Sequence, residues 1–319
     1  MSTLKTFATI VTVGLVGLWS TTTIAQITIN GNEIIFPDAS TQSVAAISGS
    51  SLVRTINVSP TPGDTTASGT AFRTAYDAIG DASAVNPYVV LLEPGVYDIG
   101  STALNLRPYV NLRGTSREST IIQSSYSGGL TIGAIDAATV TVELSSFTLS
   151  LTATNNAAGI WCYQSQMSIE DVNVTYANSI TGTVYGVATG NSASNLKMRN
   201  CQITIPTFGS STTVIGFKND GGNANLDQCE IVLNESEATL GATRVLGVDN
   251  RSGTGTSNLR NCRVIAHDDT ATNAHALLAF TGNINAGSTE LFGSLLNFGA
   301  TNIKVVGCWD SSFNPITDG

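Results

Sequence analysis

Charged side chains are scarce in this sequence. Lysine, arginine, aspartate and glutamate make up 12% of the 319 residues, with 14 basic against 23 acidic side chains. Helical bundles need charged residues on their solvent-facing sides, so this composition argues against them. No cluster of basic residues could neutralise phosphates, and we therefore expect no nucleic-acid partner.

The apolar run near the start is too short to cross a membrane comfortably. It extends from Phe7 to Trp19, follows a single lysine, and precedes Thr23 and Ala25, which are small residues of the kind found before a signal-peptidase cut. A transmembrane helix needs about 20 apolar residues. We predict a secretory signal peptide over residues 1–25; the alternative is a membrane anchor.

Cysteine is rare as well. The five cysteines include no Cys-x-x-Cys pair, and an odd number leaves at least one unpaired within the chain. Export would permit disulfides. The spacing gives no support to a zinc site, so we predict no metal.

The abundant apolar and small polar residues are arranged in a repeat. A pattern of one apolar residue, two intervening residues and a second inward-facing residue recurs, and its last positions are 25, 29, 28 and 33 residues apart. Between these segments lie short β-rich runs and Gly, Ser, Asn and Thr, without helical periodicity. Units of about 30 residues predict a solenoid whose strands pair with their equivalents one turn above and below. The last positions of the five copies are Phe147, Val172, Cys201, Cys229 and Cys262.

These five side chains are predicted to form one inward-facing file. The thiols would act as small apolar side chains. Parallel stacking makes poor disulfide geometry, although a disulfide or a metal site is the alternative.

The two intervening residues of each copy are predicted to form a bend between consecutive strands. Asp171, Asn200 and Asn261 occupy its second position, where a left-handed backbone suits Asn and Asp, whereas Ser146 and Gln228 fit less well. The first positions alternate in sign on successive turns and are expected to pair across strands. They are Glu170, Arg199, Asp227 and Arg260.

Residues 70–114 carry a resemblance to a known superfamily. A helical pattern over Phe72–Ile79 is followed by the strand Tyr88–Leu92, the turn Glu93-Pro-Gly-Val-Tyr97 and the strand Val110–Gly114. This order resembles the start of the pectin-lyase-like parallel β-helices, most of all the pectinesterase branch. The resemblance implies an all-β, right-handed, single-stranded parallel β-helix with a short N-terminal capping helix.

The catalytic motifs of that superfamily are missing. Neither Gln-Asp-Thr nor Asp-Phe-Ile-Phe-Gly of the pectinesterases occurs, and the remaining candidates are His267, Asp268 and Asp269. The two aspartates could act as acid and base on a glycosidic bond or bind calcium. The Thr-rich segment around them is also typical of a solvated loop.

A set of polar residues follows the glycines of the repeat. Aligned on one long face, these side chains could form a groove for an extended glycan; the alternative is the ordinary polar coat of a β-helix. They are Lys218, Asn219, Asp249, Asn250 and Arg251.

The segment before the repeats has a different character. Residues 27–46 contain Phe36-Pro-Asp-Ala-Ser-Thr-Gln42, which resembles a short segment that precedes repeats in phage-tail-like and bacterial surface proteins. We predict an N-terminal hairpin and linker over residues 26–54 that could join copies into an oligomer, followed by a β-helix domain over residues 55–319.

Together these patterns favour an exported, non-catalytic surface or extracellular protein that serves adhesion or glycan binding. Its expected partner is a polysaccharide or a cell-surface glycan, and it needs no cofactor. One alternative is a polysaccharide lyase, esterase or glycoside hydrolase. Another is a structural subunit of a fibre or tail-like trimer.

Overall fold

The computed structural model describes residues 53–135, 141–153, 155, 157–177, 180–206, 212–233, 244–251, 255–267, 274–297, 303–310 and 312–316, and three short strands before them. The chain forms two compact units, which divide after Ser51. In the first, a three-stranded antiparallel sheet consists of β1 (Thr28–Asn30), β2 (Glu33–Ile35) and β3 (Thr41–Ser43). The predicted signal peptide lies outside the described residues.

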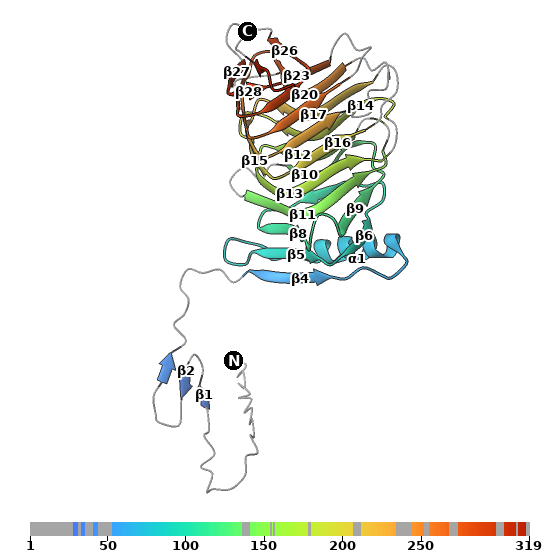
Figure 1. The fold of residues 1–319 in the computed structure, drawn as a ribbon. Helices are drawn as coiled ribbons and strands as arrows, with labels where there is room; N and C mark the ends of the chain where they lie inside the picture. The colour runs from blue at the N-terminus through green and yellow to red at the C-terminus, as the bar shows by residue number, and fades with distance from the viewer. Residues whose placement is uncertain are drawn as a thin grey trace, which may run out of the picture. The chain divides into compact units, whose positions relative to one another are not determined.

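The second unit is the predicted right-handed parallel β-helix (Figure 1). Each turn contributes strands to three parallel sheets. Sheet 1 contains eight strands: β7 (Leu104–Leu106), β10 (Gly129–Ile135), β12 (Ala157–Tyr163), β14 (Thr183–Gly190), β17 (Thr213–Asp220), β20 (Arg244–Asn250), β23 (Ala274–Ala279) and β26 (Ser294–Asn297).

Sheets 2 and 3 are continuous within two long strands, β11 (Thr141–Leu151) and β13 (Gln166–Tyr176), whose first halves belong to sheet 2 and second halves to sheet 3. The other strands of sheet 2 are β4 (Arg54–Val58), β5 (Tyr88–Leu92), β8 (Val110–Gly114), β15 (Asn195–Arg199), β18 (Asn223–Asp227), β21 (Thr256–Arg260), β24 (Asn283–Gly287) and β27 (Ile303–Val306). Those of sheet 3 are β6 (Gly95–Asp98), β9 (Thr120–Ser124), β16 (Gln202–Ile205), β19 (Glu230–Leu233), β22 (Arg263–Ala266), β25 (Glu290–Phe292) and β28 (Cys308–Trp309), which pairs antiparallel with β29 (Pro315–Ile316).

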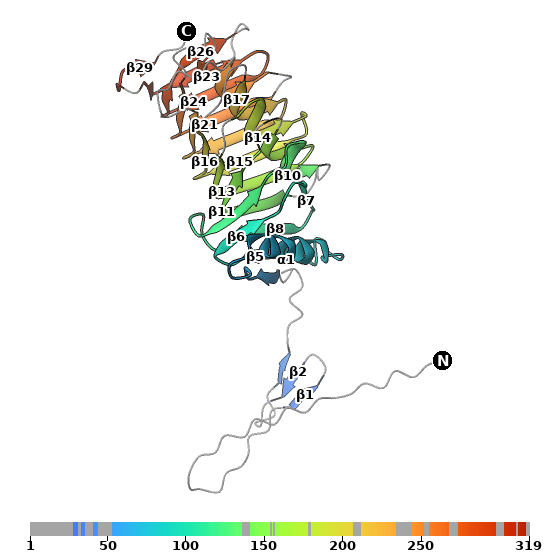
Figure 2. The same ribbon diagram turned by 90° about the vertical axis from the view of Figure 1, so that its right-hand side faces the viewer.

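One helix covers the N-terminal end of the solenoid, as predicted (Figure 2). Helix α1 spans Thr65–Asp77, so it begins earlier than the Phe72–Ile79 pattern indicates. The Asp64 carboxylate accepts a hydrogen bond from the backbone N–H of Ala67 at 2.8 Å, and this cap starts the helix over Thr, Ser and Gly residues that favour helix only weakly. Phe72 and Tyr76 are fully buried beneath it.

The bend between sheets 2 and 3 has the backbone conformation that the sequence predicts. Asp171, Asn200 and Asn261 have φ values of 55°, 51° and 53°, in the left-handed region. Ser146 and Gln228, the residues that suit this conformation less well, adopt it too, with φ of 57° and 54°. The stacking of the turns therefore fixes the backbone here, whichever residue occupies the position.

The inward file lies in the core. Phe147, Val172, Cys201, Cys229 and Cys262 are each at most 5% exposed, and Phe147 is directly in register with Val172. All five cysteines of the chain are buried, and none of them forms a disulfide. Burial raises the pKa of the Cys162 thiol to about 12, which keeps it protonated at neutral pH.

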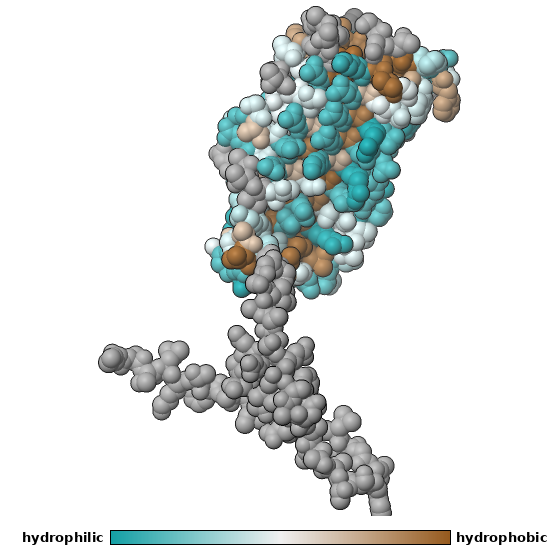
Figure 3. Space-filling view, turned by 90° about the vertical axis from the view of Figure 1, so that its left-hand side faces the viewer, coloured by the Kyte–Doolittle hydropathy of each residue, from teal (hydrophilic) through white to brown (hydrophobic). Residues whose placement is uncertain are grey.

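The outward charges pair across the turns as expected. Arg199 forms an ion pair with Glu170. Arg260 donates hydrogen bonds from Nε and Nη2 to the two carboxylate oxygens of Asp227, each at 3.1 Å. Hydrophilic side chains accordingly line up in columns along the solenoid (Figure 3). Pairs as exposed as these contribute little to stability, but they favour the correct register over a slipped one.

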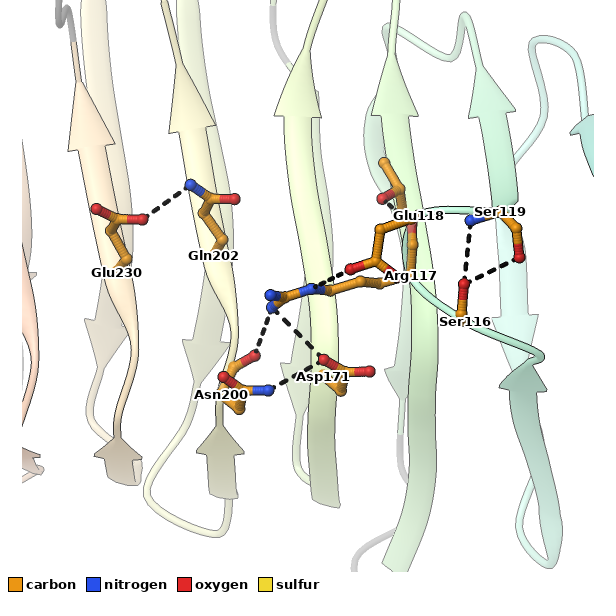
Figure 4. Close-up of polar contacts among 9 residues, drawn as sticks. Ser116, Arg117, Glu118, Ser119, Asp171, Asn200, Gln202 and Glu230 are labelled. Carbon is orange, nitrogen blue, oxygen red and sulfur yellow. Dashed lines mark hydrogen bonds and ion pairs between the residues drawn. The ribbon is translucent and has the colours of Figure 1, made fainter.

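The loop between β8 and β9 contacts the bends of two later turns through Arg117 and so acts as a brace between them. Arg117 lies across β11 and β13 to reach Asp171 at 3.5 Å and the backbone oxygen of Asn200 at 3.3 Å (Figure 4). The amide of Asn200 donates a hydrogen bond to Asp171 at 3.0 Å. This brace ties together residues 83 positions apart in the chain.

Candidate functional site

The outer face of sheet 1 carries most of the polar residues predicted to bind a ligand, but it is not the polar face that we expected. Towards the C-terminal end it is apolar: Ile215, Leu246 and Leu278 form a small buried cluster, separate from the core inside the solenoid. Tyr185 and Leu296 pack against this cluster.

Two of the five predicted binding residues point into the solenoid. Asn219 is fully buried, accepts a hydrogen bond from Thr189 at 2.7 Å, and donates to Ser257 and to the backbone oxygen of Gly222, each at 2.9 Å. Asn250 is also fully buried and donates to the backbone oxygen of Asn283 at 2.8 Å. The expected solvent-facing position is therefore wrong for both residues, which hold neighbouring turns together from the inside.

The other three form ion pairs at the edge of the apolar cluster. Lys218 pairs with Asp220, and its ammonium lies 4.9 Å from the centre of the Tyr185 ring. Arg251 Nε lies 2.7 Å from the carboxylate of Asp249, which is fully buried. Burial raises the pKa of the Asp249 carboxyl, and the charges of Arg251 and Lys218 oppose this shift.

Beside these charges lies a set of aromatic side chains that the sequence interpretation missed. Trp161 and Tyr163 project from β12, and Tyr185 projects from the adjacent strand β14. The rings of Trp161 and Tyr185 meet edge to face, with centroids 6.5 Å apart. We call Trp161, Tyr163 and Tyr185 the aromatic strip.

Small residues on β14 make room for the strip. Trp161 is in register with Ala188, and Tyr163 with Gly190. A Cβ atom on Gly190 would lie 2.9 Å from the Tyr163 ring and 3.4 Å from the Trp161 ring nitrogen. The alternation of β12, with Ile160 and Cys162 buried inside, places these two rings outside and could have identified them from the sequence.

A hollow of about 300 Å³ opens at the aromatic strip. Trp161 and Tyr185 line it together with Thr183 and small residues of β10 and β12, namely Gly129, Ala157 and Ala158. An aromatic wall with a few polar groups at its rim suits an amphipathic ligand of modest size.

The described part of the structure does not bring the predicted catalytic residues together into a site. His267 directly follows β22, and its ring centre lies 5.1 Å from that of Phe292. Asp268 and Asp269 lie outside the described residues, so an acid–base pair or a calcium site there stays a prediction. Among the residues described, no group of three or more His, Cys, Asp and Glu side chains could hold a metal ion.

Comparison with known proteins identifies the fold and no more. No protein-family model matches this chain, and no curated protein sequence does. Pectin methylesterase PemA from Erwinia chrysanthemi is similar in structure, with 15% identity, a TM-score of 0.51, and coverage of 82% of this chain and 90% of that one.

Two more distant likenesses have TM-scores too low to support an argument. Geobacillus virus E2 ORF18 has 12% identity and a TM-score of 0.40, and 80% of this chain aligns with 60% of that one. The alginate lyase from Paenibacillus sp. str. FPU-7 has 10% identity and a TM-score of 0.32, over 83% of this chain and 98% of that one. In the described part of the chain, no helix is both long and apolar enough to span a membrane.

Proposed function

We propose that the protein is an exported, non-catalytic β-helix that binds a polysaccharide or a cell-surface glycan through the aromatic strip. The observation that carries this proposal is the outward projection of Trp161 and Tyr163 over Ala188 and Gly190, next to the hollow that Tyr185 also lines. Sugar rings have an apolar face that packs on aromatic rings and hydroxyls that hydrogen-bond at the rim.

The charged residues suit the same ligand. Lys218 and Asp220 lie at the edge of the strip, and both side chains are partly exposed. A paired ammonium and carboxylate offer donors and acceptors to hydroxyl groups without adding net charge. Secretion to the medium or retention at the cell surface is part of this proposal.

A glycan-array screen followed by affinity measurements on variants tests it. Changing Trp161 and Tyr163 together to Ala removes the stacking surface, and we expect the dissociation constant of the glycan that scores highest to rise at least about tenfold. Trp309→Ala is the matched control, because Trp309 is a partly exposed aromatic on sheet 3. Equal losses in both variants, or an array without any bound glycan, would refute the proposal.

A second candidate function, a polysaccharide-active enzyme, is favoured by one observation. The buried Asp249 carboxyl has a raised pKa and lies beside Arg251, close to the strip. Perturbed carboxyls of this kind occur at active sites as well as in structural ion pairs. Wild-type protein that generates unsaturated ends, reducing ends or free acid from a polysaccharide, and loses this activity on Asp249→Asn, would replace the binding proposal with a catalytic one.

A further inference from the structure

The outer face of sheet 2 carries a second and longer groove. One hollow of about 530 Å³ lies over β13, β15, β18 and β21, and another of about 570 Å³ lies over β8, β11 and β13. Ser168 and Glu170 line both hollows, so the two lie next to each other on the same face, and we treat them together as one groove. The groove crosses stacked strands from β8 to β21, which at about 4.8 Å per strand gives a length of about 24 Å along the solenoid axis.

Side-chain amides form a ladder along this groove. Asn258 donates a hydrogen bond to the oxygen of Asn225 at 2.9 Å and accepts one from Asn285 at 2.8 Å. Asn225 and Asn258 line the groove, and Asn285 continues the row on β24. Each amide has two N–H donors and two lone pairs, so one bond to each neighbour leaves donors and acceptors for a ligand. These free groups repeat once per turn.

The charges of the groove compensate one another. Four basic and four acidic side chains line the two hollows, and two ion pairs within the groove, Glu170–Arg199 and Asp227–Arg260, neutralise half of them. The groove therefore has no net charge, although the whole chain carries a formal charge of −9. Neither a polyanion nor a polycation gains from long-range attraction to this face. The charged residues are Arg113, Glu143, Glu170, Asp171, Lys197, Arg199, Asp227 and Arg260.

We infer that this groove binds an uncharged, extended polysaccharide whose chain lies along the solenoid axis. Hydroxyl groups both donate and accept hydrogen bonds, which matches the mixture of amides, hydroxyls and paired charges here. A linear chain presents such groups at regular intervals, as the amide ladder does. This site lies on a different sheet from the aromatic strip and does not depend on the proposed function of that strip.

Affinity electrophoresis in gels that contain galactomannan, xyloglucan or mixed-linkage β-glucan, with alginate as the anionic comparison, tests the inference. We expect at least one neutral polymer to retard the native protein equally at low and high salt. The double variant Asn225→Ala/Asn258→Ala should raise the dissociation constant at least about tenfold, because the hydrogen bonds of two amides to the ligand are lost.

Two further variants keep the result interpretable. Lys197→Ala changes an exposed lining residue and, if the groove binds the polymer, should weaken retardation without altering the melting temperature. Asn283→Ala alters an exposed amide on β24 outside the groove and should leave retardation unchanged.

Retardation by alginate alone, or by no neutral polymer, would overturn the inference, as would retardation that all three variants share with the native protein. The Trp161→Ala/Tyr163→Ala variant separates the two sites, since it should bind neutral polymers in the sheet 2 groove as the native protein does. A failure of one site is thereby distinguishable from a failure of the other.

Discussion

At the scale of single residues, the bend between sheets 2 and 3 shows a conflict between local preference and stacking. Six successive turns place a non-glycine residue there in the left-handed region, with φ between 48° and 57°. Asn and Asp adopt this conformation readily, whereas most other residues pay about 1 kcal/mol or more for it. The six residues are Ser146, Asp171, Asn200, Gln228, Asn261 and Ser288.

Gln228→Asn should therefore stabilise the protein. The longer side chain gains nothing from the left-handed backbone, and we expect the free energy of unfolding to rise by about 0.5–1 kcal/mol. Urea denaturation of the native protein and the variant measures this difference. Gln123→Asn, on the extended strand β9, is the control and should give no gain. A gain of the same size in both variants would show that the bend is not the cause.

At the scale of the elements, a column of glycines explains how sheet 1 lies against sheet 3. Gly186, Gly216 and Gly247 lie one above another on β14, β17 and β20 and form this glycine column. A Cβ atom on Gly186, Gly216 or Gly247 would come within 2.3 Å of a side-chain methyl of Ile203, Ile231 or Val264, in that order. None of the three glycines has a positive φ. Glycine is needed here for close approach of the sheets and not for backbone freedom.

Gly216→Ala should for this reason destabilise the fold by about 1–3 kcal/mol, the usual cost of overpacking a core. Its methyl would also lie 2.8 Å from the backbone oxygen of Gly247, which has little freedom to move. Gly287→Ala is the control, because the nearest atom to its Cβ position is 4.0 Å away. Thermal unfolding followed by circular dichroism compares the two, and equal melting temperatures would contradict the packing argument.

The same column marks where prediction from the sequence succeeded and where it failed. The parallel stack, the inward file from Phe147 to Cys262 and the bend follow from a repeat whose alternation is regular in sheets 2 and 3. In sheet 1 the alternation breaks at Gly216: Ile215 faces outward, yet Phe217 packs in the main core. Lys218 therefore points outward and Asn219 inward, a division that simple alignment of polar residues does not reveal.

The two proposed binding surfaces were harder to predict for a related reason. The aromatic strip depends on the small residues Ala188 and Gly190 lying opposite Trp161 and Tyr163. This pairing is set by the register between β12 and β14. The sheet 2 groove is formed by exposed side chains of different lengths on several turns. No single sequence motif specifies it.

At the scale of the whole molecule, the chain consists of two units, with the division after Ser51. The resemblance of residues 27–46 to segments of tail-like proteins predicts that the first unit joins copies of the chain. The three short strands β1, β2 and β3 fall within this segment.

Deletion of residues 26–50 tests this prediction. We expect the molar mass in solution, measured by light scattering, to fall from a multiple of the chain mass to that of a single chain. The deletion leaves the second unit, which begins at Leu52, intact. Circular dichroism of the shortened protein checks that its β structure is retained, and an unchanged number of chains per particle would contradict the role given to the segment.

The register between turns also makes the length of the solenoid adjustable in whole steps. Gln202 is directly opposite Glu230, so a chain that passed from Cys201 straight to Glu230 would omit one complete turn and continue in the same lateral position. The shortened molecule would lose about 4.8 Å of height and one rung of the amide ladder, Asn225. Duplication of the same segment would add both. The reach of such a protein along an extended ligand can thus change in steps of one whole turn, by internal copying or loss.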